Sequence, residues 1–266
     1  MNLKNFRFET DNDGIALLTW DMPGRSMNVI TPEVIDEIEN TVDHVAAQTG
    51  IKGCVIASGK ETFSGGADLS MLQNAAADYQ KARQEKGEEE ATKLFFERAS
   101  RLSLVYRKLE TCGKPFAIAI SGICLGGAFE LALACHYRVI ADDDKTKVGL
   151  PEIKVGLFPG GGGTQRVARL MPTADALQML FKGDQIKPKA AKTMNLVHEV
   201  TPAAEIVAKA KAWIAAGGKA GSPWDEPNFR LPSGKVFSPQ GMMMWPPANA
   251  IYRPETHDNY PAAKAI

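Results

Sequence analysis

Two glutamates, each close to a glycine-rich turn, are the residues of this chain whose type and spacing could do chemistry. Glu130 follows a turn at residues 122–127, and Glu152 follows Pro151 and precedes a glycine cluster at residues 160–163. Two neighbouring carboxyl groups can act as general acid and general base. Backbone N–H groups in a glycine turn can point into a cleft because no side chain blocks them.

Two of these turns are candidates for an oxyanion hole. One is the loop FSGGAD at residues 63–68, and the other is the turn at residues 125–127. Amides that converge on a carbonyl oxygen would stabilise an enolate by about 3 kcal/mol per donor. The spacing alone is only weak support for this site, because glycine turns between strands and helices are common.

The elements that would position these residues alternate between strands and helices. Apolar runs predict strands at residues 6–9, 15–20, 55–58, 116–120 and 137–141. Thr31 and Pro32 are typical of a helix start. Further helices are expected after residue 127 and at 94–109, 163–170, 174–181, 188–194 and 203–215. The repeated strand–turn–helix order predicts an α/β fold.

Two segments differ from this pattern. Residues 74–92 are polar, which predicts a solvated helical insertion; a lid over a binding site is the alternative. Half of the 16 prolines lie from Pro223 onward, which predicts an extended segment packed on a surface. Residues 261–266 resemble the first turn of a helix. We therefore expect a catalytic domain at residues 1–215 and a Pro-rich tail or linker at residues 216–266.

Charge and motifs argue against several other functions. The 31 basic and 31 acidic residues give no net charge, so no field attracts nucleic acid. The four cysteines lack metal-ligand spacing and predict buried thiols. No apolar run predicts a membrane span or a signal peptide, and a cytoplasmic location is expected. The sequence contains no Walker phosphate loop, GxGxxG or GxSxG motif.

Taken together, the motifs resemble the enoyl-CoA hydratase/isomerase, or crotonase, family. The motifs are FSGGAD at 63–68, GICLGGAFE at 122–130, Pro151-Glu152, and PGGGGTQR at 159–166. The tail from Lys219 is similar to the branch of multifunctional fatty-acid oxidation α-subunits. In that branch a crotonase domain precedes a 3-hydroxyacyl-CoA dehydrogenase domain. The resemblance implies a spiral of repeated β-β-α units with a C-terminal helical region.

The resemblance also implies roles for single residues. Glu130 and Glu152 would hold one water against C3 of a trans-2-enoyl-CoA, and Glu152 would protonate C2. The product would be an L-3-hydroxyacyl-CoA of fatty-acid β-oxidation, and a Δ3-Δ2 isomerase side activity is expected. The N–H groups of Gly65 and Gly127 would form the oxyanion hole. Coenzyme A would contact the chain at residues in two loops and in the turn before Gly127: Arg25, Met27, Ala67, Asp68, Leu69 and Gly126.

A second role is open for some of these residues. Arg25 is either a phosphate contact or a solvated loop residue, and Asp68 is expected to hold its loop rather than do chemistry. Hydration needs no cofactor or metal; NAD would serve only a downstream dehydrogenase domain. The full-length protein is expected to join a thiolase subunit. The rival functions are an enoyl-CoA isomerase only, or a non-catalytic acyl-CoA-binding or assembly module.

Overall fold

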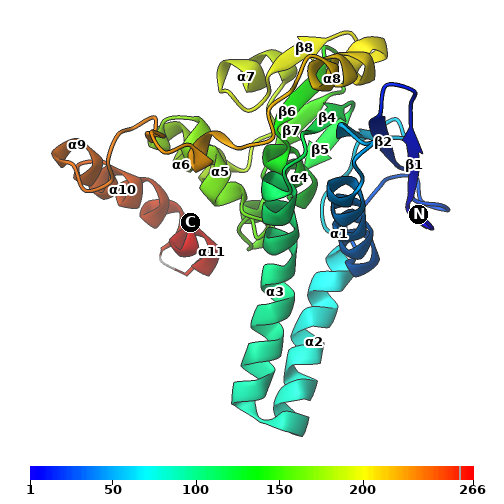
Figure 1. Ribbon diagram of the computed structural model, residues 1–266. Helices are drawn as coiled ribbons and strands as arrows, with labels where there is room; N and C mark the ends of the chain where they lie inside the picture. The colour runs from blue at the N-terminus through cyan, green and yellow to red at the C-terminus, as the bar shows by residue number, and fades with distance from the viewer. Residues whose placement is uncertain (258) are drawn as a thin grey trace.

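The computed structural model describes residues 1–257 and 259–266, apart from the side chains of Leu69, Leu72, Gln73, Gln240, Ile251 and Glu255. Strands and helices alternate along the described chain, as predicted for an α/β protein (Figure 1). No helix within these residues combines the length and apolar character that a membrane span requires.

The five predicted strands are present within two residues of their expected bounds. The strands are β1 Phe6–Thr10, β2 Ile15–Trp20, β3 Gly53–Ser58, β4 Phe116–Ile120, β5 Ile123–Leu125, β6 Tyr137–Ala141, β7 Lys147–Gly149 and β8 Glu199–Thr201. The short strands β5, β7 and β8 are additional to the predicted ones. The first helices are α1 Pro32–Ala47, α2 Leu69–Lys86, α3 Glu88–Thr111 and α4 Gly127–Ala134. They are followed by η1 Glu152–Val155, α5 Gly163–Leu170, α6 Thr173–Lys182, α7 Pro188–Thr193, η2 Ala203–Glu205, α8 Ile206–Ala215 and η3 Pro223–Asp225.

The main sheet of the described chain has the strand order β1-β2-β3-β4-β6-β8. β1 and β2 form an antiparallel hairpin, and the other neighbours are parallel. The central strands β3 and β4 are almost entirely apolar because both faces of a parallel sheet are covered. One face packs on α8 through Ala210 and Ile214. The other face packs on α1, α3 and α4, where the larger core lies.

A β-β-α unit repeats along the chain and places both glycine turns on one side. β4 leads through the short strand β5 into α4, and β6 leads through β7 to η1 and α5. β5 and β7 pair in a second, smaller sheet. In the same way, β3 leads through the loop that contains Ser64 into α2. Ser64 forms a parallel bridge with Cys124. The loop at 63–68, the start of α4 and η1 are therefore equivalent corners of successive units.

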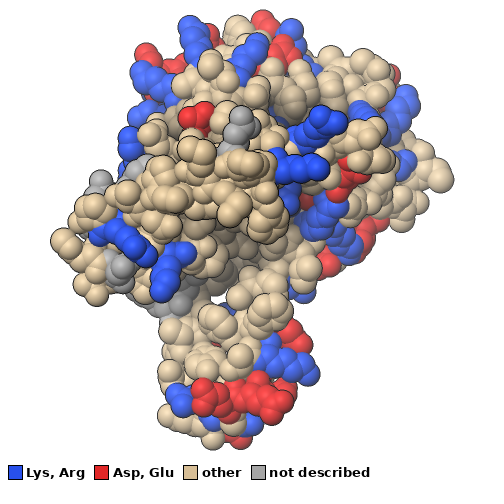
Figure 2. All heavy atoms as spheres, turned by 90° about the vertical axis from the view of Figure 1, so that its left-hand side faces the viewer, with Lys and Arg blue, Asp and Glu red and all other residues tan. Residues whose placement is uncertain are grey.

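The polar insertion at residues 74–92 covers most of α2 and the start of α3, which together form a helical hairpin that projects from the body (Figure 1). α2 and α3 pack along each other and are joined at Gly87. Charged side chains gather at the tip of the hairpin (Figure 2), where Arg83, Lys86 and Glu88 are exposed. The predicted solvated helix is confirmed, and the helix expected from residue 94 already begins at Glu88.

The prediction of an extended tail is wrong for residues 239–242 and 245–256, whereas the helical turn expected from Pro261 is confirmed. The structure has helices α9 Pro239–Met242, α10 Trp245–Thr256 and α11 Pro261–Ala265, which lie beside α5 and α6 (Figure 1). Prolines stand in the first turn of each helix, where a missing N–H costs no hydrogen bond. The division of the chain at residue 215 stays a prediction.

Candidate active site

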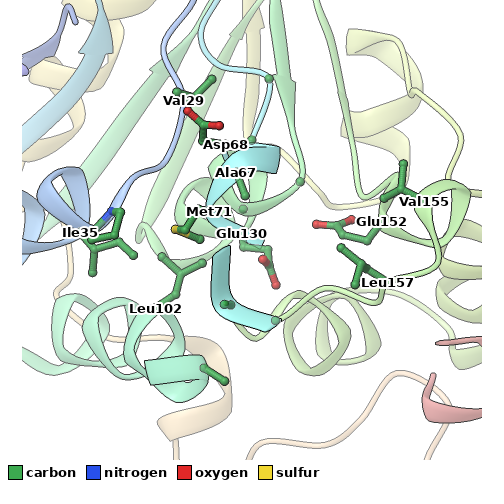
Figure 3. Close-up of a pocket in the computed structure, with 18 of the residues that line it drawn as sticks. Val29, Ile35, Ala67, Asp68, Met71, Leu102, Glu130, Glu152, Val155 and Leu157 are labelled. Carbon is green, nitrogen blue, oxygen red and sulfur yellow. The ribbon is translucent and has the colours of Figure 1, made fainter. Parts of the chain in front are cut away.

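The predicted site residues line one cavity of about 890 Å³. The cavity lies between the base of the α2–α3 hairpin, the two glycine turns and the segment that begins at Pro151 (Figure 3). The predicted residues that line it are Arg25, Met27, Gly65, Ala67, Asp68, Gly126, Gly127, Glu130 and Glu152. Leu69 begins α2, but its side chain lies outside the described part of the structure.

The two glycine turns are held together by backbone hydrogen bonds. Ser64 N–H donates to Ile123 O at 2.8 Å, and Leu125 N–H donates to Ser64 O at 3.1 Å. Gly66 has a φ of +100°, and a methyl group there would lie 2.9 Å from Leu125 O. This close approach requires glycine, and it brings the loop at 63–68 against the start of α4.

One of the two predicted oxyanion-hole amides is already occupied. Gly65 N–H donates to Asn28 O at 3.3 Å. Asn28 is fully buried, and its side chain contacts Trp20 O and Phe63 O, which fixes this arrangement. Gly65 N–H therefore has a backbone acceptor in this structure, and its role as an oxyanion donor stays a prediction.

The amides of Ala67 and Gly127 remain available. Gly127 is the first residue of α4, where an N–H has no intrahelical acceptor. Neither N–H has a hydrogen-bond partner among the residues described by the structure, and both residues line the cavity. The loop and the start of α4 therefore each contribute one residue with an unpaired N–H, among the described residues, to the lining of the cavity.

Glu130 lies in the first turn of α4 and is only 1% exposed. Its Oε1 accepts a hydrogen bond from Gly163 N–H at 2.7 Å. Burial raises the pKa of Glu130, while amide hydrogen bonds from Gly163 and Gly161 and the charge of Arg166 oppose the rise. These donors all favour the carboxylate over the neutral acid.

A buried ion pair supports the glycine cluster that contacts Glu130. Arg166 Nε donates to Glu110 Oε1 at 2.7 Å, and Arg166 Nη1 donates to Gly161 O at 2.7 Å. Arg166 and Glu110 are 5% and 3% exposed. Sequence reasoning missed Glu110; its signal is a carboxylate inside the apolar stripe of α3, next to Leu109.

Glu152 is the first residue of η1, and its carboxyl group reaches the same cavity (Figure 3). Burial, and then the charge of Glu130, raise the pKa of Glu152 to about 8. Its Oε2 is buried and has no hydrogen-bond partner among the described residues. A methyl group at Gly126 would lie 3.1 Å from Glu152 Oε1, so the carboxyl group packs against the turn before α4.

Two charged residues form the rim of the cavity. Arg25 Nη1 pairs with Asp68 Oδ2 at 2.9 Å. Asp68 also caps α2 by accepting from Ser70 N–H at 3.0 Å, which agrees with the expected loop-holding role. Arg25 is half-exposed, and its role as a phosphate contact stays a prediction. No group of three or more potential metal ligands gathers within the described residues.

Removing one member of the buried ion pair should destabilise the fold. Arg166→Met leaves the Glu110 carboxylate buried beside a single half-exposed partner, Arg107. We expect the free energy of unfolding in urea to fall by about 3–5 kcal/mol. Arg169→Met, at a partly exposed position of the same helix where the guanidinium bonds only Gln165 within the described chain, should change it by less than about 0.5 kcal/mol. Equal losses in the two variants would contradict the importance of the pair.

The raised pKa of Glu152 should appear in the pH dependence of stability. The folded chain holds this proton up to about pH 8, whereas the ordinary value is 4.5. The free energy of unfolding contributed by Glu152 should therefore fall as pH rises through this window. The free energy of unfolding of Glu152→Gln, measured in urea relative to that of wild type, should therefore increase by roughly 2–4 kcal/mol from pH 5 to pH 9. A constant difference across this range would show an ordinary Glu152 pKa.

Comparisons with known proteins agree on one family. The model of the enoyl-CoA hydratase/isomerase family matches residues 10–220. The fatty acid oxidation complex subunit alpha of Shewanella frigidimarina is 42% identical over 83% of this chain. That of Shewanella amazonensis is 38% identical over 99%. The chain spans only 29% and 35% of these two relatives.

Solved structures show the same fold. An enoyl-CoA hydratase from Geobacillus kaustophilus superposes with a TM-score of 0.70 at 26% identity, covering 82% of this chain and 76% of that one. An enoyl-CoA hydratase from Bacillus anthracis superposes with a TM-score of 0.66 at 26% identity, covering 80% and 76%. The site geometry, the fold and these matches agree, and the chain belongs to the enoyl-CoA hydratase/isomerase family.

Proposed function

We propose that this chain adds water across the double bond of a trans-2-enoyl-CoA to give an L-3-hydroxyacyl-CoA in fatty-acid β-oxidation. The observation that carries the proposal is the meeting of Glu130, Glu152 and two unpaired backbone amides in one cavity. The family of the chain and the names of its relatives support the same substrate class.

The thioester oxygen accepts hydrogen bonds from the N–H groups of Gly127 and Ala67. The Ala67 amide takes the place first expected for Gly65, whose N–H is bonded to Asn28. Negative charge develops on this oxygen when the nucleophile adds to C3. Each preorganised amide lowers the barrier by about 3 kcal/mol.

The two carboxyl groups divide the proton transfers. Glu130, held as a carboxylate by amide donors, takes a proton from the water whose oxygen bonds to C3. Glu152, neutral at pH 7 because of its raised pKa, gives its proton to C2. The two carboxyl groups together carry one proton before and after turnover. This proton is on Glu152 before the reaction and on Glu130 after it, and proton exchange with solvent returns it to Glu152.

The apolar part of the cavity receives the acyl chain. Its walls come from the base of the hairpin and from the segment after η1, and include Met71, Phe95, Leu102, Leu157 and Phe158. Arg25 stands at the rim, where coenzyme A phosphates would enter. No cofactor takes part in this reaction scheme.

The same pair of carboxyl groups supports a second activity, the shift of a 3-enoyl double bond to position 2. One group removes a proton from C2 and the other delivers a proton to C4, while the same amides hold the enolate. A panel of 2-enoyl-CoA and 3-enoyl-CoA substrates separates the activities, because an enzyme with isomerase activity only leaves 2-enoyl-CoA unhydrated.

The relatives are longer proteins, and this chain matches one part of them; they suggest its cellular role. We propose that it acts as the hydratase part of a cytoplasmic fatty-acid oxidation α-subunit, with a 3-hydroxyacyl-CoA dehydrogenase domain that uses NAD and a thiolase partner subunit. The match to proteins named fatty acid oxidation complex subunit alpha supports this role.

Neutralising either carboxyl group should remove most of the hydratase activity. We expect Glu130→Gln and Glu152→Gln each to lower kcat for crotonyl-CoA by about 10²–10⁴-fold, followed as loss of absorbance of the conjugated thioester. Glu97→Gln, on the exposed face of α3, is the control and should retain full activity. Binding of coenzyme A without turnover by the wild-type chain would instead favour the non-catalytic alternative.

The hydration rate should fall on the alkaline side. Because Glu152 gives up a proton in the reaction, kcat/KM should decline above about pH 8 as this group ionises in the substrate-free chain. A pH profile of initial rates measures this limb. A flat rate to pH 9.5 would exclude Glu152 as the acid.

A further inference from the structure

The last helix of the chain packs directly against the turn that carries Glu152. Tyr260, the residue before α11, donates its hydroxyl hydrogen to Ile153 O at 2.6 Å, across 107 residues of sequence. Ile153 O also accepts from Gly156 N–H at 3.2 Å, which closes the η1 turn. The tyrosine is therefore bonded to the carbonyl of the residue that follows Glu152.

An apolar cluster reinforces this contact. Ile153, Ala262 and Ala263 are at most 8% exposed and form a small core separate from the two main cores, with Phe181 and Tyr252 packed against it. The rings of Phe181 and Tyr252 lie 5.7 Å apart and join α6 to α10. The residues after 220, beyond the part matched by the family model, thus supply much of the support behind η1.

Apart from α6 and α11, the η1 turn and the residues after it are largely open to solvent or to the cavity. Val155 and Phe158 are 61% and 47% exposed, and the side of the turn that bears Glu152 faces the cavity. Gly183, which ends α6, fits closely beside Pro151 and Ile153. The turn is only four residues long and has no side-chain cap. A short turn that holds a desolvated carboxyl group would rotate that group toward water unless its backbone were fixed.

We propose that Tyr260, together with α11, is a positioning residue for Glu152: it fixes the η1 backbone so that the carboxyl group stays inside the cavity. This inference rests on the proposed function for its catalytic meaning. It assigns part of the C-terminal segment to the hydratase site, whereas the sequence predicted only a tail or linker there.

Kinetics of two tyrosine variants test the proposal. Tyr260→Phe removes the hydroxyl group and keeps the ring, so the fold should persist; near-UV circular dichroism checks this. We expect kcat for crotonyl-CoA to fall about 10- to 100-fold with little change in KM, as for a misplaced catalytic group. Tyr252→Phe is the matched control from the same cluster, because no hydrogen bond of its hydroxyl is found among the described residues.

A merely structural role would not change the ionisation of Glu152. The titratable groups on elements packed around it are Glu130 of α4, Lys154 of η1, Asp184, which pairs with Lys154, Lys182 of α6, and Tyr260 and Lys264 at α11. None of these except Tyr260 changes in the variant. Greater access to water should lower the pKa of Glu152 in Tyr260→Phe and move the alkaline limb of the pH profile to lower pH.

Carboxyl ¹³C NMR of glutamate-labelled protein measures this pKa without turnover, with Glu152→Gln for assignment. A lower Glu152 pKa in Tyr260→Phe, but not in Tyr252→Phe, supports the proposal even if the wild-type chain hydrates no substrate. A Glu152 pKa and kcat in Tyr260→Phe equal to those of wild type overturn it. Absence of wild-type turnover would instead count against the proposed function alone.

Discussion

Glu130 and Glu152 share a cavity that removes both carboxyl groups from bulk water. Isolation of one such charge is costly, and two like charges in the same place repel, so burial raises both pKa values. The two carboxyl groups differ in the hydrogen bonds that they accept. Amides of the glycine cluster stabilise the charged form of Glu130, while Glu152 Oε2 finds no donor among the described residues. The surroundings of Glu130 therefore favour its charged form more than those of Glu152 do.

Much of the fold serves to hold this unfavourable arrangement. The repeated β-β-α unit brings the loop at 63–68 and the start of α4 into contact through Ser64 and Leu125. The buried pair of Arg166 and Glu110 fixes the glycine cluster above Glu130. Support for the two glutamates thus comes from opposite sides of the cavity, from α3 and α5 for one and from α6 and α11 for the other.

The sequence predicts best those features that depend on local patterns. Continuous apolar runs predict β4 and β6 with the observed bounds, and the motifs identify Glu130 and Glu152. The three-residue strands β5 and β7 are too short to show a period. The hydrogen bond of Gly65 N–H depends on Asn28, 37 residues before Gly65, which no local pattern reveals. The number of prolines favoured an extended tail, but prolines at first-turn positions are compatible with helices.

A crystal structure with a bound, unreactive acyl-CoA tests the convergence of these groups most directly. The thioester oxygen should lie about 3 Å from both Ala67 N and Gly127 N. C2 and C3 should lie between the carboxyl groups of Glu130 and Glu152, with the acyl chain toward Phe95 and Phe158. A thioester bound outside the cavity, or one whose oxygen faces neither amide, would contradict this account of the site.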